Sequence, residues 1–141
     1  MEHSPSFLRL VADAKTRVRE ISTEQAHARL AQNPRAVLLD VHEDHEWQKG
    51  HAVEAVHLGR GIGERDLEKM VPDPDTEIIT YCGGGFRSAL TCDVAQKMGY
   101  HIPNIPSIPK VKPPFIRDNL SFICRWCVVT LIRLLSHKTA V

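Results

Sequence analysis

Apolar residues recur at helical spacing along the N-terminal stretch, between residues 7 and 18. This pattern predicts an amphipathic helix with Ser4 or Ser6 as its cap. A second helix is expected to begin at Ser22, because Gln25 follows it by three residues and completes a capping-box pattern. Both helices precede the first strongly apolar run of the chain.

Short apolar runs then alternate with helical patterns. The runs at 36–40 ("AVLLD") and 77–81 ("EIITY") are typical of strands buried on both faces of a parallel sheet, and 55–58 is a weaker strand candidate. A third helix is expected over 89–98, with Gly99 at its C-terminal cap. Alternating helices and strands predict an α/β fold with parallel strands.

The pattern changes after Gly99. Repeated prolines between residues 101 and 115 exclude a central strand and indicate extended, polyproline-like chain. The last apolar segment, 120–135, is interrupted by arginines and is too short to span a bilayer, so a buried helix, an interfacial helix and an exposed tail all stay open. The chain is therefore expected to have three parts: a helical extension at 1–20, one domain at 21–100, and a divergent Pro-rich and apolar tail at 101–141.

The overall composition is that of one ordinary globular domain. The chain has 141 residues, 43% of them hydrophobic and 25% charged, which allows one core but hardly two. A formal net charge of +1 gives no basis for a nucleic-acid footprint or for a funnel toward acidic substrates. The N-terminus is charged throughout and lacks the apolar region of a signal peptide, so a cytoplasmic location is expected.

The four cysteines do not form a disulfide pattern. Their irregular spacing favours free thiols in a reducing setting. Cys92, on the predicted third helix, is expected to pack as a small apolar group. Cys124 and Cys127 have the spacing of a redox or metal motif, but no second pair matches them, and chance is the better explanation.

The stretch "YCGGGFRS", from Tyr81 to Ser88, places three glycines between a cysteine and an arginine. It follows a predicted strand and precedes a predicted helix, which is where parallel sheets usually bind ligands. Gly83–Gly85 can turn successive N–H groups toward one point and favour negative charge there, with Cys82 and Arg87 at the two ends. A thiol of pKa near 8.5 falls to about 3.5–7.5 in such surroundings, which predicts a nucleophilic thiolate. The alternative is a tight turn in which the cysteine only ends the strand.

Two separate motifs resemble the rhodanese, or sulfurtransferase, family. "YCGGGFRSALTCDVAQKMGY" is similar to that family's active-site loop and following helix. "LLDVHEDHEWQKGH" is similar to its upstream signature, an Asp-Val-Arg-Glu stretch leading to an aromatic residue and Gly-His, and "HLGRG" resembles the segment that usually comes next in the family. The resemblance implies a rhodanese-like α/β fold, a parallel sheet flanked by helices, with an atypical C-terminal segment replacing the usual last strand and helix.

The resemblance also implies the chemistry. Cys82 would take the sulfane sulfur of a donor such as thiosulfate as a persulfide and pass it to cyanide or a thiol, while Arg87 steadies the anions. No cofactor and no metal are implied, and the partners are a small-molecule sulfur donor and a thiol or cyanide acceptor. The substrate-binding residues expected from the loop are Gly83, Gly84, Gly85, Phe86 and Ser88.

Three alternatives stay open. Cdc25-like phosphatases resemble the same fold, but their loop has one residue more than the four that separate Cys82 from Arg87 here, so phosphate fits less well. A catalytically impaired binding or regulatory module would result if loss of the last strand compromises the sheet. The third is membrane contact through an interfacial anchor at 115–135, and nucleic acid is not expected as a partner.

The polar residues of the upstream motif also have structural explanations. Asp40 and Glu46 match acidic positions of the family motif, whereas His42 stands where that family usually has arginine. A buried carboxylate is expected to satisfy backbone N–H groups rather than to do chemistry. Trp47 is expected in the core. The histidines between residues 42 and 57 match no compact zinc spacing, so no metal site is predicted.

Overall fold

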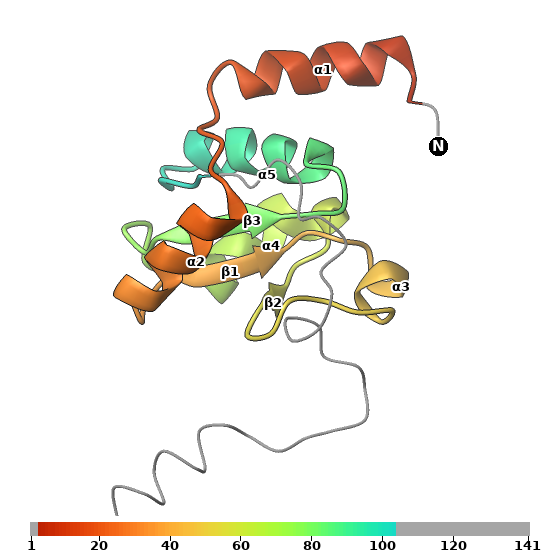
Figure 1. Cartoon of the computed structure of the whole chain (residues 1–141). Helices are drawn as coiled ribbons and strands as arrows, with labels where there is room; N and C mark the ends of the chain where they lie inside the picture. Colours follow the sequence, from red (N-terminus) through yellow and green to blue (C-terminus); the bar gives the residue numbers. More distant parts are fainter. Residues whose placement is uncertain (1–2, 104–141) are drawn as a thin grey trace, which may run out of the picture.

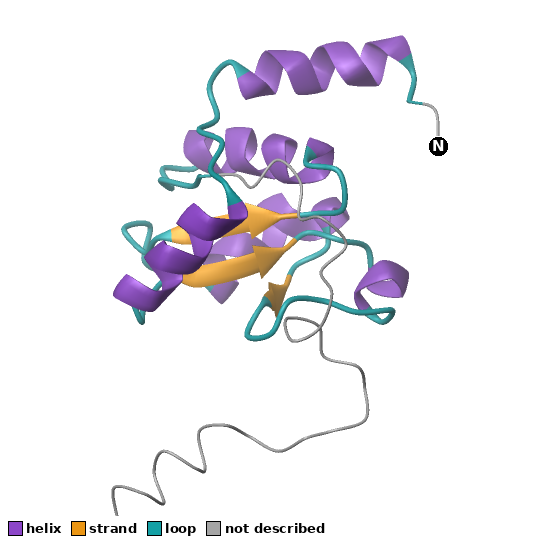
Figure 2. Cartoon of the chain, viewed as in Figure 1, coloured by secondary structure: helices purple, strands orange, loops and turns teal. Residues whose placement is uncertain are grey.

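Three short parallel strands form the centre of the molecule, in the order β2-β1-β3. The computed structural model describes residues 3–103 of the chain. The strands β1 (Val37–Asp40), β2 (Val56–His57) and β3 (Ile78–Tyr81) lie within the three predicted runs. Both longer strands point toward the same edge of the sheet (Figure 2). The predicted α/β fold with a parallel sheet is confirmed.

Helices cover both faces of this sheet (Figure 1). Because successive residues of a strand point to opposite faces, neighbouring strand residues belong to different cores. Ile78 packs in one core with α4 (Gly63–Met70) and α5 (Phe86–Lys97), and Ile79 packs in the other with α2 (Thr23–Gln32). The sheet is therefore a middle layer, which explains why its strands are apolar throughout.

The predicted helix ends are largely confirmed. Ser4 caps α1 (Pro5–Lys15) by accepting a hydrogen bond from the Phe7 N–H, and the capping box of Ser22 and Gln25 is present at α2. The predicted start of the third helix at residue 89 is wrong, because α5 begins at Phe86, immediately after the glycine loop.

Two further helices and one short 3₁₀ turn were not predicted. They are α3 (Asp44–Trp47), η1 (Arg60–Ile62) and α4. In α4 only Gly63 and Leu67 are buried, so its apolar stripe is too narrow to stand out in the sequence. In α3 a single turn is held by a capping box between Glu43 and Glu46.

Helix α1 lies outside α5 rather than on the sheet (Figure 1). Val11 and Ala14 are buried there, and Arg17 forms an ion pair with Asp93 of α5 at 2.7 Å. Leu8, at 42% exposure, does not share this buried face. The predicted amphipathic helix is thus present, and it forms an added layer on one side of the domain.

The chain continues to pack against the domain after α5. Gly99 has a φ of +98°, which ends the helix as predicted. Tyr100 and Ile102 are buried, the Tyr100 hydroxyl donates to the Val71 carbonyl at 2.6 Å, and the Thr80 N–H donates to the Pro103 carbonyl at 3.3 Å. The predictions for the tail from residue 104 onward, including the replaced last strand and the Cys124–Cys127 pair, lie outside the described residues.

Candidate functional site

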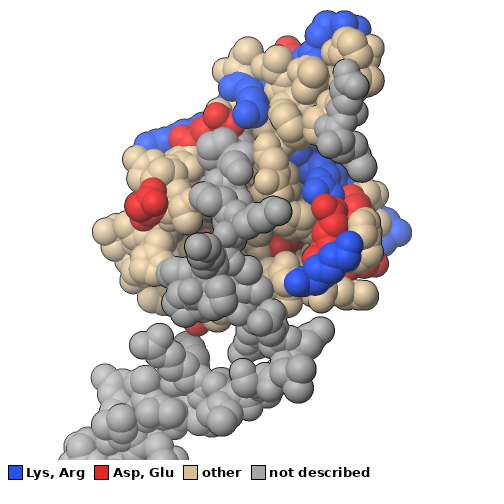
Figure 3. All heavy atoms as spheres, turned by 45° about the vertical axis from the view of Figure 1, so that its right-hand side comes forward, with Lys and Arg blue, Asp and Glu red and all other residues tan. Residues whose placement is uncertain are grey.

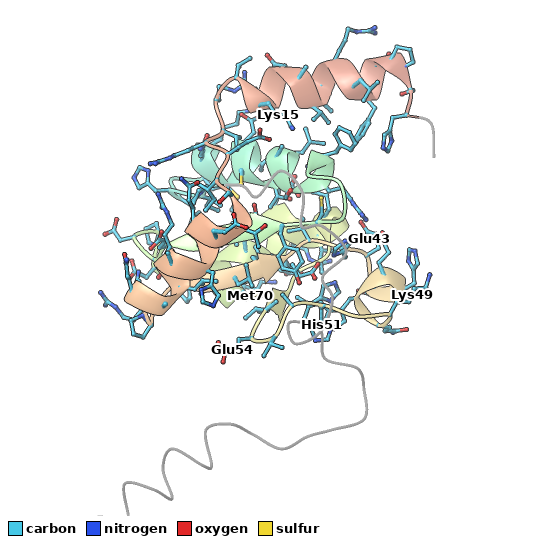
Figure 4. All side chains as sticks on the ribbon, viewed as in Figure 1. Lys15, Glu43, Lys49, His51, Glu54 and Met70 are labelled. Carbon is cyan, nitrogen blue, oxygen red and sulfur yellow. The ribbon has the colours of Figure 1, made fainter. Side chains whose placement is uncertain are left out.

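The candidate site lies where β1 and β3 end side by side. The strand order is β2-β1-β3, so the chain leaving β1 passes through α3 to β2 on one side of β1, whereas β3, which leads into α5, lies on the other side of β1. In parallel sheets such a change of direction opens a crevice at the carboxyl ends of the strands. Two short loops meet there, residues 41–43 after β1 and 82–85 after β3, with Glu43 marking the first of them (Figure 4).

The loop after β3 wraps around the sulfur of Cys82. The backbone N–H groups of Gly84, Gly85 and Ser88 hydrogen-bond to this sulfur, and the Ser88 hydroxyl lies 3.4 Å from it. Gly85 has a φ of +76°, a left-handed conformation that favours glycine and brings the loop directly into α5. Cys82 is only 1% exposed, while Gly83 and Gly84 are exposed. Of the predicted loop residues, Gly84, Gly85 and Ser88 thus contact the Cys82 sulfur.

These contacts lower the pKa of the Cys82 thiol. Burial raises it, but the Ser88 hydroxyl and the N–H groups of Ser88, Gly84 and Gly85 together outweigh burial. Hydrogen bonds to a thiolate stabilise the charged form, and the start of α5 lies behind the loop. The loop therefore favours the form of sulfur that acts as a nucleophile.

Arg87 does not point freely into the loop, because Glu46 of α3 holds its guanidinium with two hydrogen bonds. Arg87 Nη2 lies 2.9 Å from Glu46 Oε1, and Nη1 contacts Oε2. The Arg87 guanidinium lowers the pKa of Glu46 to about 2. A two-point contact of this kind fixes the plane of the guanidinium as well as its position. Glu46 is thus a partner of the loop arginine, which its place in the sequence motif did not reveal.

A second pair of residues reaches the loop from the end of β1. Asp40 is fully buried, and its Oδ1 accepts hydrogen bonds from the His42 backbone N–H at 2.8 Å and the ring Nδ1 at 2.7 Å. The backbone bond is the structural role expected for Asp40. The other ring nitrogen, Nε2, lies 3.2 Å from where a Cβ on Gly83 would be. Asp40, the largest influence, and the Cys82 charge raise the pKa of His42, although burial and Arg87 oppose this.

Phe86, the candidate substrate-binding side chain, is contacted by the N-terminal end of α1. Its ring lies edge-on to His3 at 4.8 Å and to Phe7 at 6.0 Å between ring centroids. Such tilted arrangements are favourable for aromatic pairs. The predicted extension at 1–20 thus reaches the residue that follows the glycine loop.

The other residues singled out in the sequence have packing roles. Trp47 is half-buried rather than fully in the core, and it stacks on the rings of His51 at 3.4 Å and His57 at 4.7 Å. Between residues 3 and 103, no group of three ligating side chains is placed to hold a metal ion. Cys92 is buried, as expected, beside Thr80 Oγ1 at 2.9 Å, and burial raises its pKa to about 12.

The distribution of charged side chains on the surface does not indicate a particular class of ligand. On the face shown in Figure 3, acidic and basic side chains are intermixed rather than gathered by sign. Of the helices that the structure describes, none has the length and apolar character needed to cross a membrane.

The fold and the site define a class: a parallel α/β protein with a cysteine cradled by backbone donors at the switch point of its sheet. The model of the rhodanese-like domain family matches residues 22–107, and the chain belongs to this family. A related protein of Bacillus subtilis (strain 168), YtwF, is a sulfurtransferase by name; it is 30% identical over 88 residues, which are 62% of this chain and 84% of YtwF. The tRNA uridine(34) hydroxylase of Chlamydia pneumoniae is 30% identical over 62% of this chain, which spans only 29% of that longer protein.

Solved structures share the same fold. The polysulfide-sulfur transferase homodimer of Wolinella succinogenes is 28% identical, with a TM-score of 0.61 over 71% of this chain and 76% of that chain. A protein of unknown function from Rhodopseudomonas palustris CGA009, described as a possible tyrosine phosphatase, has a TM-score of 0.62 at 24% identity over 76% of this chain and 89% of that chain. At 24% identity, the similarity to the Rhodopseudomonas palustris protein shows a shared fold and nothing about function. Membership of the sulfurtransferase family is thus supported by both sequence and structure.

Proposed function

We propose that this protein is a sulfurtransferase that moves a sulfane sulfur from a donor such as thiosulfate to a thiol or cyanide, through a persulfide on Cys82. The observation that carries the proposal is the convergence of the Gly84, Gly85 and Ser88 N–H groups on the Cys82 sulfur. Membership of the rhodanese-like family supports the same reaction class.

In the first half-reaction the Cys82 thiolate attacks the outer sulfur of thiosulfate. A new bond forms between the two sulfur atoms, the bond within thiosulfate breaks, and sulfite leaves with the electron pair. The negative charge then lies on the outer sulfur of the persulfide, next to the loop whose backbone N–H groups favour negative charge. No general base is needed in this step, because the loop already favours the thiolate.

Arg87 supplies a positive charge beside the loop, and its ion pair with Glu46 fixes the orientation of that charge. An anionic donor is attracted by this side of the site, while the pairing with Glu46 limits how strongly it is held. The donor would contact the surface beside Cys82 that is formed by Gly83, Gly84 and Phe86.

Phosphatase activity is the weaker alternative. Only four residues separate Cys82 from Arg87. In addition, the Arg87 guanidinium is hydrogen-bonded to Glu46 rather than free to bind the oxygens of a tetrahedral phosphoryl group. We expect no phosphate release from an aryl phosphate under conditions in which sulfur is transferred.

The test is the intact mass of the full-length protein after incubation with thiosulfate. We expect a gain of one sulfur atom that maps to Cys82 and is removed by cyanide as thiocyanate. The Cys82→Ser variant should gain nothing.

The matched control is Cys92→Ser, which removes a buried thiol ten positions away on α5 and should load sulfur like the wild type. A folded wild-type protein that gains no sulfur on Cys82 would overturn the proposal and favour a binding or regulatory module.

A further inference from the structure

His42 stands in a position to act on the ligands of the Cys82 loop. It follows β1 by two residues, and its Nε2 lies 3.2 Å from where a Cβ on Gly83 would be. Gly83 is exposed and directly follows Cys82, and the His42 side chain keeps 16% of its surface exposed. The imidazole edge therefore lies against the residue that directly follows Cys82.

The hydrogen bond to Asp40 decides which ring nitrogen carries the proton. Because a carboxylate oxygen accepts hydrogen bonds, we assign the hydrogen of this contact to Nδ1, which lies 2.7 Å from Asp40 Oδ1. In the neutral ring this leaves the lone pair on Nε2, the nitrogen that faces the loop. The His57 ring nitrogen at 2.8 Å from the His42 carbonyl holds the backbone of this residue as well. The His42 ring is therefore held in one orientation, with its basic nitrogen, Nε2, facing Gly83.

Charged and titratable groups from several elements face His42. Asp40 at the end of β1 and Cys82 after β3 favour its protonated form, Arg87 of α5 disfavours it, and the Glu46 carboxylate of α3 interacts with its charge as well. Tyr81 of β3 lies edge-on to the ring at 5.9 Å, and His57 of β2 contacts the His42 carbonyl. The net effect, dominated by Asp40, raises the pKa of His42 above its usual 6.5. A base of this strength is suited to proton transfer near neutral pH.

We propose that His42 is the general base of the second half-reaction and that the acceptor it serves is a protonated alkyl thiol, with Asp40 as the positioning residue. This inference rests on the proposed function, since it requires a sulfur-loaded Cys82. The family resemblance suggests arginine at this position, and an arginine there has no basic nitrogen to offer.

Atoms and electrons balance in this step. The acceptor thiol gives its proton to Nε2 of His42, and its sulfur forms a bond to the outer sulfur of the persulfide. The bond between that outer sulfur and Cys82 Sγ breaks, and its electron pair stays on Sγ as a thiolate. The acceptor leaves as a persulfide, and the transferred sulfur keeps the proton or negative charge that it had on Cys82. His42 later releases the proton it received to water. Sulfur is exchanged between two thiols, so no external oxidant or reductant is required.

The test separates loading of sulfur from its discharge. Full-length wild type, His42→Gln and His42→Arg are loaded with thiosulfate, and intact mass records the added sulfur. The loaded proteins are then mixed with 2-mercaptoethanol, which is protonated at neutral pH, or with an aryl thiol that is already ionised. Loss of the added sulfur is followed in a single turnover.

We expect all three proteins to load sulfur, because the first half-reaction needs no base. Discharge to 2-mercaptoethanol should slow by roughly 10²-fold in both variants, the lower end of the effect of general-base catalysis, whereas discharge to the ionised thiol should be unchanged. In the wild type, discharge to 2-mercaptoethanol should increase as pH rises through the raised pKa of His42 and then level off. In His42→Gln it should keep rising toward the pKa of the thiol itself.

The matched control is His45→Gln, which removes an exposed histidine of α3 and should behave as wild type. If His42→Gln discharges to both thiols at the wild-type rate, or slows both equally, the inference is overturned while the proposed function stands. If His42→Arg retains the wild-type rate with 2-mercaptoethanol, a charge and not a base is needed, and the inference is again overturned. If wild type takes up no sulfur, it is the proposed function that fails.

Discussion

The hydrogen-bond donors around the Cys82 sulfur all come from residues within six positions of it. The N–H groups that contact its sulfur belong to Gly84, Gly85 and Ser88, and the nearest hydroxyl is that of Ser88. These donors belong to the loop between β3 and α5, so they are close neighbours of the sulfur in the chain as well as in space. This is why the sulfur's environment was predictable from one short stretch of sequence.

Removing the Ser88 hydroxyl tests how far side-chain donors control this thiol. The Ser88→Ala variant loses one hydrogen bond to the thiolate, so the pKa of Cys82 should rise. A hydrogen bond to a charged group is worth about 1.5–3 kcal/mol, so the pH profile of Cys82 alkylation should move to clearly higher pH. The measurement is the pH dependence of iodoacetamide alkylation at Cys82, mapped by mass spectrometry.

A Cys82→Ser protein provides the background from the other cysteines. Thr91→Ala, which removes a hydroxyl that bonds to the Arg87 carbonyl one turn away on α5, serves as the control for loss of a helix hydroxyl. Equal alkylation profiles for Ser88→Ala and wild type would show that the backbone donors alone set the reactivity.

At the scale of elements, α1 is the part whose role was least visible in advance. Its spacing predicted an amphipathic helix, but nothing in the pattern indicated which surface it would cover. In the structure it packs on α5, with Val11 and Ala14 buried, and its first turn reaches Phe86 beside the loop. A helix in this position joins the N-terminal extension to the candidate site through α5.

A buried charge should detach α1 without unfolding the domain. Val11 is 2% exposed, and an unpaired carboxylate there costs several kcal/mol. In Val11→Asp we therefore expect fast amide hydrogen exchange over residues 5–15 and unchanged protection in β1, β3 and α5. The control is Leu10→Asp, because Leu10 is 56% exposed and the same charge should be tolerated there. Loss of protection throughout the domain would show instead that α1 is an essential part of the core.

At the scale of the whole molecule, the packing extends past the predicted end of the domain. The boundary at residue 100 was placed where the sequence pattern changes. Ile102 is nevertheless 2% exposed within the core shared by α4 and α5, and the Pro103 carbonyl accepts a hydrogen bond from Thr80 at the edge of β3. We propose that the stable domain includes residues up to at least 103.

Truncating Ile102 tests this extent. In Ile102→Ala we expect the free energy of unfolding to fall by about 2–5 kcal/mol, as is typical for a large side chain removed from a packed core. Urea denaturation measures this change, and an unaltered m-value would show that the same surface is still exposed on unfolding. His101→Ala, at the exposed neighbouring position, is the control and should leave the midpoint unchanged. Equal midpoints for the two variants would place the end of the domain before residue 102.

The sequence by itself determined the three strands, the helices α1, α2 and α5, and the cysteine loop. Strand hydrophobicity, helix caps and the glycine run are local properties, and the residues around Cys82 are close neighbours in the chain. Helices with a narrow apolar stripe, such as α4, escaped prediction because few of their side chains are buried.

Only the tertiary structure decided which distant residues join the loop. Glu46 meets Arg87 across 41 positions, and His42 reaches Gly83 because β1 and β3 pair in parallel and end at the same edge. The sequence motif marked Glu46 and His42 but not their partners. Strand order and register place these side chains around Cys82, and both are set by packing across the whole sheet.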